Sequence, residues 1–138
     1  PGFSAWLRGV RDDPAASNLA AVDLSELDLL DQPNWHENPE AVGRLEPLVT
    51  NLAAYYYLRA KDRHGRPIDP VARFHLGNGA RLERINWLAD ISAKGLREGH
   101  GLMVNYLYDP DRIESNLEAF AAGGRIDAST TVKRQAKR

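Results

Sequence analysis

Residues 69–108 read DPVARFHLGNGARLERINWLADISAKGLREGHGLMVNYLY, and this stretch decides the fold of the 138-residue chain. Apolar and polar residues alternate in three places along it, which predicts antiparallel strands near residues 70–77, 81–88 and 102–108. Gly77-Asn78-Gly79 allows a positive φ at each position and so predicts a tight turn between the first two strands.

Strict alternation in the first predicted strand divides its side chains between two faces. Ala72, Phe74 and Leu76 form an apolar set that should face the core. We therefore expect Phe74 to be buried. His75 falls on the other face, beside the turn, where it should border a cleft that a ligand can reach.

Helical patterns flank these strands. The strongest runs from about Leu45 to Ala60, where apolar residues recur at helical spacing: Leu45, Leu48, Val49, Leu52, Ala53 and Tyr56. Asn38-Pro39 and Asp109-Pro110 each read as a helix start, with a capping side chain followed by proline. Helices packed with antiparallel strands place the chain in the α+β class.

Composition narrows the class of protein. Hydrophobic residues make up 43% and charged residues 27%, as in ordinary globular domains. The chain has no cysteine, which excludes disulfides and zinc–thiolate sites. No apolar run reaches the length of a membrane span and no secretory signal is visible, so we expect a cytoplasmic protein without membrane association.

Charge is distributed unevenly along the chain, whose net charge is −1. Residues 125–138 carry five Lys or Arg and one Asp, a net charge of +4, which leaves −5 on the rest. A mildly acidic body does not suit a nucleic-acid partner. We expect residues 1–124 to form the folded unit and residues 125–138 to be a basic, disordered tail.

Few residues of the sequence are candidates for catalysis or for a metal or phosphate site. The four histidines (His36, His64, His75 and His100) lack the spacing of a metal site, and no phosphate-binding glycine loop is present. His75 is the best candidate for acid–base work, because an imidazole exchanges protons near neutral pH. The alternative is a hydrogen-bonded histidine on an edge strand. Asn86, Asn105, Tyr106 and Tyr108, on neighbouring predicted strands, could add hydrogen-bond donors.

Three motifs resemble the malonyl-CoA decarboxylase family: PVARFHLGNGA at residues 70–80, RINWLAD at 84–90 and GLMVNY at 101–106. Pro1-Gly2-Phe3 with Trp6-Leu7 is similar to the start of that family's last segment. The resemblance covers residues 1 to about 108. It implies a GNAT-type acetyltransferase-like fold, present here in part, and a separate helical domain through which the complete enzyme forms a homo-oligomer.

The resemblance also implies site residues. The family's catalytic histidine falls on His75, while its catalytic serine and its CoA-phosphate loop lie upstream of Pro1. Because the chain starts at Pro1 without an initiator Met, we expect a fragment. Because the serine and the CoA-phosphate loop are missing from it, we expect this fragment to be inactive alone.

The implied reaction is decarboxylation of malonyl-CoA to acetyl-CoA and CO2. The thioester carbonyl accepts the electrons, so we expect no metal and no organic cofactor. His75 would deliver the proton, with Tyr108 and Asn86 as predicted helpers. Two other functions stay open: a GNAT-like acyltransferase that uses CoA thioesters, and a non-catalytic interaction module for which His75 is dispensable.

Overall fold

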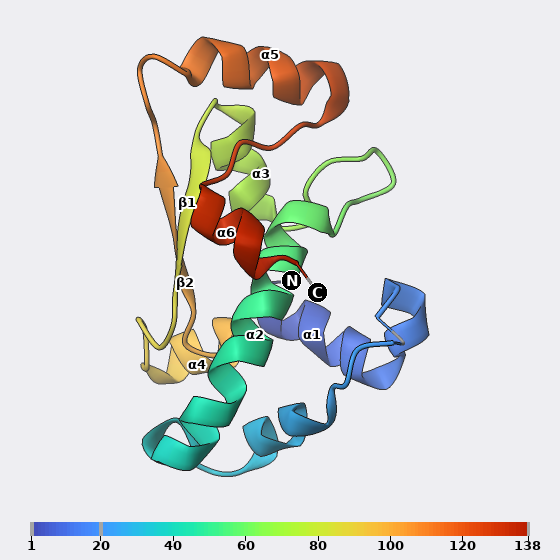
Figure 1. Ribbon diagram of the computed structural model, residues 1–138, viewed down its shortest axis with the longest axis vertical. Coiled ribbons are helices and arrows are strands. Elements are labelled where there is room, and N and C mark those ends of the chain that lie inside the picture. Colours follow the sequence, from blue (N-terminus) through green and yellow to red (C-terminus); the bar gives the residue numbers. More distant parts are fainter. Residues whose placement is uncertain (1, 20, 138) are drawn as a thin grey trace.

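The computed structural model describes residues 2–19 and 21–137. In it, helices are arranged around one long central helix and a pair of strands (Figure 1). In chain order the elements are α1 (Phe3–Asp12), the short 3-10 helices η1 (Pro14–Ser17), η2 (Ser25–Asp31) and η3 (Trp35–Glu37), then α2 (Pro39–Arg59), α3 (Pro70–Gly77), β1 (Arg81–Asn86), α4 (Ala93–Gly99), β2 (Met103–Leu107), α5 (Ile113–Gly123) and α6 (Thr130–Gln135). The α+β class is confirmed.

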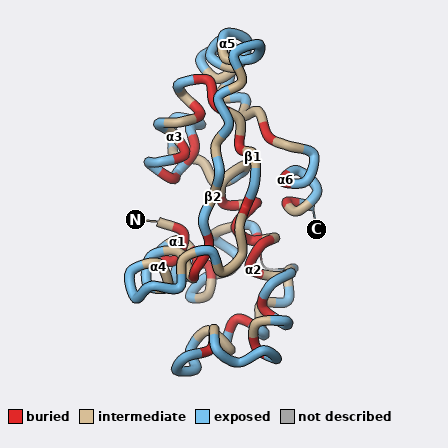
Figure 2. The backbone as a smooth tube through the Cα atoms, turned by 90° about the vertical axis from the view of Figure 1, so that its left-hand side faces the viewer, coloured by how far each residue is buried: buried red, intermediate tan, exposed pale blue. Residues whose placement is uncertain are grey.

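The strands β1 and β2 lie where the second and third strands were predicted, and they pair antiparallel. Leu82 lies opposite Tyr106, and the register shifts between Leu82 and Arg84, which marks a β-bulge. Because of the bulge, Leu82 and Ile85 are both buried although they are three positions apart. In Figure 2 this pair runs along much of the length of the molecule.

The first predicted strand is wrong, because residues 70–77 form the helix α3. Its start is fixed by Asp69, whose Oδ1 accepts hydrogen bonds from the backbone N–H groups of Val71 (3.0 Å) and Ala72 (2.9 Å). Pro70 occupies the first turn, where proline is compatible with a helix. This is the same capping signature that opens α2 at Asn38 and Pro39.

The predicted burial of Phe74 is therefore also wrong, since its side chain is 64% exposed. The buried residues of α3 are Ala72 and Leu76, four positions apart, as expected for a helix that buries one face. Gly79 does adopt a positive φ of 91°, but it follows a helix end and leads into β1. A Cβ at Gly79 would lie 2.8 Å from the carbonyl oxygen of Ile113.

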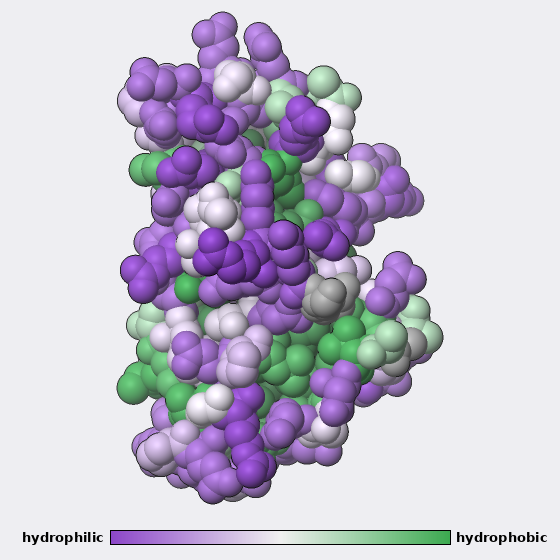
Figure 3. Space-filling view, in the orientation of Figure 1, coloured by the Kyte–Doolittle hydropathy of each residue, from purple (hydrophilic) through white to green (hydrophobic). Residues whose placement is uncertain are grey.

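The core forms around α2, against which residues of α1, α3, β1 and α6 pack. The long helix α2 begins at Pro39, earlier than its strongest pattern, and buries the predicted stripe from Leu45 to Tyr56, with Leu48 at its margin. Phe3, Leu7 and Val10 of α1 pack into the same cluster. Figure 3 shows a mostly hydrophilic surface with an apolar area in the lower half, over the region where α1 and α2 pack.

The predicted disordered tail is also wrong for the residues described. Ser129 caps α6, and the backbone of Leu82 bonds to both Asp127 (2.9 Å) and Ser129 (3.0 Å) at the outer edge of β1. Ala128, Val132 and Ala136, spaced four apart, are buried in the core. Burial of these apolar groups stabilises the segment despite its positive charge.

Candidate active site

His75 and Tyr108 form the centre of the candidate site. The last turn of α3 carries His75 toward β2, and its Nδ1 lies 2.7 Å from the Tyr108 hydroxyl just beyond the end of that strand. The imidazole also stacks on the ring of Tyr106, with centroids 4.4 Å apart and planes at 21°. The helix thus brings together two of the three predicted site residues.

The hydrogen bond at Nδ1 of His75 is coupled to the choice of which ring nitrogen carries the hydrogen. When the Tyr108 hydroxyl donates to Nδ1, the neutral ring carries its hydrogen on Nε2. The Nε2–H group is then the one available to a substrate. A hydrogen-bonded ring of this kind can deliver a proton and recover it, which is what general acid catalysis requires.

A second group of side chains surrounds Asp69, which is 7% exposed. Its Oδ2 accepts a hydrogen bond from the hydroxyl of Tyr56 at 2.8 Å. Burial raises the pKa of the Tyr56 phenol, and this hydrogen bond raises it further. Burial also raises the pKa of Tyr57 and of Tyr106, with added effect from the charge of Asp69 in both. These phenols stay protonated at physiological pH.

A groove opens beside these residues. One cavity of about 470 Å³ is lined by residues of α1, α2, α4 and β2 and of the start of α3, which include Phe3, Tyr57, Asp69, Val71 and Tyr106. A neighbouring cavity of about 480 Å³ shares Gly2, Asp69, Val71 and Glu98 with it. The described lining residues do not include His75, whose ring lies against Tyr106. The expectation that His75 itself borders a cleft is therefore not met by these cavities, one of which is lined instead by Tyr106.

Asn86 does not join this site. It lies at the far end of β1, opposite Met103, and its amide nitrogen bonds to the Oδ1 of Asn105. Asn105 neighbours Tyr106 on β2, so it faces the other side of the strand pair. Asn86 lines a separate cavity of about 410 Å³ together with residues of α2 and α6. The structure gives the predicted helper role of Asn86 no support.

The sequence patterns did not single out Tyr57, Asp69 or the environment of His100. The Asp-Pro helix start was the available signal for Asp69, whereas Tyr57 was hidden among three consecutive tyrosines. His100 is only partly exposed, and its ring meets Phe3 edge-on. Burial lowers the pKa of His100 to about 4, and the charges of Arg11 and Arg8 add to this effect.

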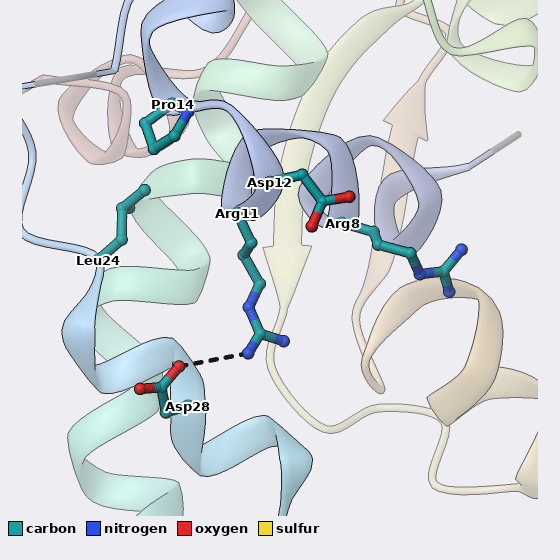
Figure 4. Close-up of a pocket in the computed structure, with 6 residues that line it drawn as sticks. All are labelled: Arg8, Arg11, Asp12, Pro14, Leu24 and Asp28. Carbon is teal, nitrogen blue, oxygen red and sulfur yellow. Dashed lines mark hydrogen bonds and ion pairs between the residues drawn. The ribbon is translucent and has the colours of Figure 1, made fainter.

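Other features of the described residues do not contribute to this site. A cavity of about 310 Å³ lies between α1 and η2, where the guanidinium of Arg11 pairs with Asp28 (Figure 4) and with Asp31. These ion pairs tie two elements together. Within residues 2–19 and 21–137, no cluster of three or more His, Asp or Glu side chains is arranged to hold a metal ion. Over the same residues, no helix is both long and apolar enough to span a membrane.

Comparison with known proteins agrees with the family resemblance. The family described as malonyl-CoA decarboxylase C-terminal domain matches residues 1–138. The mitochondrial malonyl-CoA decarboxylases of Anser anser anser and Rattus norvegicus are each 33% identical over 150 aligned positions, which cover 96% of this chain and 30% of those proteins. The chain therefore spans less than a third of the length of these relatives.

Solved structures give the same result. The crystal structure of malonyl-CoA decarboxylase from Rhodopseudomonas palustris is 50% identical with a TM-score of 0.90, over 98% of this chain and 31% of that one. The enzyme from Agrobacterium vitis is 46% identical with a TM-score of 0.92, over 100% of this chain and 34% of that one. The chain therefore belongs to the malonyl-CoA decarboxylase family and corresponds to its C-terminal domain.

Proposed function

We propose that this chain supplies the C-terminal part of the active site of an enzyme that converts malonyl-CoA to acetyl-CoA and CO2. The relatives carry this activity in their names, and they are about three times as long as the chain. One observation supports the assignment to these residues. His75, where the resemblance places the catalytic histidine, contacts Tyr108 at 2.7 Å and stacks on a residue that lines the groove.

The reaction needs three things from the protein. The bond between C2 and the carboxylate carbon breaks, CO2 leaves, and the electron pair moves into the thioester to form an enolate. The protein orients the carboxylate, stabilises the enolate oxygen with hydrogen-bond donors and protonates C2. In this proposal a protonated His75 gives its Nε2 proton to C2 and returns to a neutral imidazole that solvent reprotonates, and Tyr108 orients the ring through Nδ1.

The proposal includes a residue outside the chain. The resemblance places the family's catalytic serine just upstream of Pro1. Gly2, which follows Pro1, lines both of the neighbouring cavities that form the groove. A residue before Pro1 would therefore enter the site beside Asp69 and Val71. This placement supports a site shared between the upstream segment and α3.

We also propose that the complete enzyme has a GNAT-type fold. Among the described residues, the outer edge of β2 carries no strand partner, whereas the outer edge of β1 is covered by Asp127 and Ser129. A free edge of this kind is where a further strand would pair. A GNAT-type sheet would continue there with a strand from the preceding segment. The cytoplasmic location and assembly through a helical domain stay predictions.

The test uses the complete enzyme with the upstream segment present. We expect His75→Asn to lower kcat for acetyl-CoA formation by about 10²–10⁴-fold while KM changes little, because proton delivery matters in the transition state. The matched control is His64→Asn, since His64 is exposed in the loop after α2. Far-UV circular dichroism verifies that both variants fold.

The outcomes separate the candidate functions. Turnover of malonyl-CoA without any amine supports decarboxylation, whereas release of free CoA only with an added amine would indicate an acyltransferase. Near-normal turnover by His75→Asn would overturn the proposal, because the proton donor would then lie elsewhere.

A further inference from the structure

Tyr106 occupies a position that the reaction scheme above leaves unused. It projects from β2, one face of its ring lies on the imidazole of His75, and it lines the cavity of about 470 Å³. Tyr57 of α2 lines the same cavity. Tyr106 is thus in contact both with the residue assigned to proton delivery and with the space open to a ligand.

The hydroxyl of Tyr106 has no hydrogen-bond partner among the described residues, which sets it apart from most tyrosines of the chain. The hydroxyls of Tyr55, Tyr56 and Tyr108 bond to Ser17, Asp69 and His75, respectively. The Tyr106 oxygen is also absent from the fully buried, unpartnered polar atoms of the described part, which are Ser4 Oγ, Trp87 Nε1 and Gln135 Oε1. It therefore stays accessible to a ligand.

The surroundings keep this phenol protonated. Burial raises the pKa of Tyr106, and the neighbouring Tyr57 and Asp69 raise it further. The carboxylate of Asp69 is itself occupied by the Tyr56 hydroxyl and by two backbone N–H groups of α3. Tyr106 can therefore act as a neutral donor of a hydrogen bond next to His75.

We propose that Tyr106 is a further catalytic residue of this site and that its hydroxyl donates a hydrogen bond to the thioester oxygen as the enolate forms. This assignment rests on the proposed decarboxylation. In the substrate, C2 and the thioester oxygen are attached to the same carbonyl carbon. Two groups whose rings lie 4.4 Å apart can serve these two atoms at once, His75 at C2 and Tyr106 at the oxygen.

The test is Tyr106→Phe in the complete enzyme. Phenylalanine keeps the ring that stacks on His75 and removes only the donor. We expect kcat to fall by about 10²–10³-fold, the usual effect of losing one donor to a developing oxyanion, with KM nearly unchanged. The matched control is Tyr55→Phe, which removes a hydroxyl from α2 that bonds to Ser17.

A second measurement isolates enolate formation. An enzyme that protonates the enolate at C2 also catalyses the reverse step, so it exchanges the C2 hydrogens of acetyl-CoA for deuterium in D2O. Tyr106→Phe should slow this exchange by a factor similar to its loss of kcat, without weakening acetyl-CoA binding. A merely structural role would not produce this matched loss.

The outcomes distinguish the two proposals. If His75→Asn abolishes turnover while Tyr106→Phe keeps normal kcat and normal exchange, the assignment of Tyr106 is wrong and the decarboxylase proposal stands. A rise in KM with unchanged kcat would likewise overturn it, since the hydroxyl would then only bind substrate. If His75→Asn keeps normal turnover, the assignment of proton delivery to His75 fails, whereas a wild-type enzyme that does not form acetyl-CoA from malonyl-CoA would overturn the proposed function itself.

Discussion

The carboxylate of Asp69 accepts a 2.8 Å hydrogen bond from the hydroxyl of Tyr56 and thereby fastens the start of α3 to α2. Its other oxygen caps the helix that carries His75 six residues later. Asp69 therefore fixes both the beginning of α3 and its position on the core. Helix capping and placement of the candidate proton donor depend on one buried carboxylate.

Removing the Tyr56 hydroxyl should loosen α3. A hydrogen bond to a charged group contributes about 1.5–3 kcal/mol, so Tyr56→Phe should lower the free energy of local opening of α3 by about that amount. Amide hydrogen exchange in the complete enzyme measures this as a loss of protection of α3 amides by about ten- to a hundredfold. Tyr55→Phe serves as the control, and equal protection in both variants would contradict the proposed link.

Tyr108→Phe should slow the reaction without weakening substrate binding. The variant loses the hydrogen bond to His75 Nδ1, so the imidazole is no longer held in one orientation. Because one hydrogen bond is worth about 1–1.5 kcal/mol, we expect kcat to fall about tenfold at constant KM.

Asn86→Ala provides the comparison in the same kinetic assay. Asn86 bonds to Asn105 on the opposite side of the strand pair, so its loss should leave kcat within about twofold. A large loss in this variant with a small one in Tyr108→Phe would reverse the assignment of the helper residue.

His100 should make stability depend on pH. Its pKa is about 4 in the folded chain and 6.5 for an ordinary imidazole, so between these values the unfolded chain binds a proton that the folded chain does not. The free energy of unfolding should therefore rise as pH increases from 4 to 6.5. The facing charges are Arg8 and Arg11, which oppose protonation, and Asp31, which favours it.

The variant His100→Asn tests this dependence. Asparagine tolerates the left-handed backbone at this position, where φ is 52°. The midpoint of thermal unfolding, measured at pH 5 and pH 7, should rise less with pH in the variant than in the wild type. An identical pH dependence would show that other groups determine it.

Replacement by alanine should change stability in opposite directions at two glycines. Gly79→Ala should destabilise by about 1–3 kcal/mol, because φ is 91° and the new Cβ would meet the carbonyl of Ile113. Gly43→Ala should stabilise by about 0.5–1 kcal/mol, because it lies inside α2 with open space around it. Thermal unfolding of both variants gives the signs, and equal shifts would contradict the backbone argument.

Parts of this fold are readable from sequence because their signals agree. In α2, the Asn38-Pro39 cap and a long apolar stripe both indicate a helix. In α3, an eight-residue segment fits both periods, since Ala72 and Leu76 satisfy spacings of two and of four. Only the capping geometry of Asp69 and Pro70 decides between them, and that signal was given too little weight.

The tail shows a similar conflict. Its charge predicted disorder, yet Ala128, Val132 and Ala136 already stand at helical spacing. The contact between His75 and Tyr108 could not be predicted from such local spacing, because the two residues are 33 positions apart in the sequence. The sequence pattern and the family resemblance both pointed to His75, whereas the contacts of Tyr106 with His75 and of Asp69 with Tyr56 needed the three-dimensional arrangement.

The covering of β1 by residues 127–129 has a genetic consequence. A nonsense codon after Ile126 would leave every residue of the candidate site encoded, including His75, Tyr106 and Tyr108. It would nevertheless strip the backbone partners of Leu82, which pairs with Tyr106 across the strands. Such an allele should behave as a null, so distance from His75 is no measure of how harmless a late truncation is.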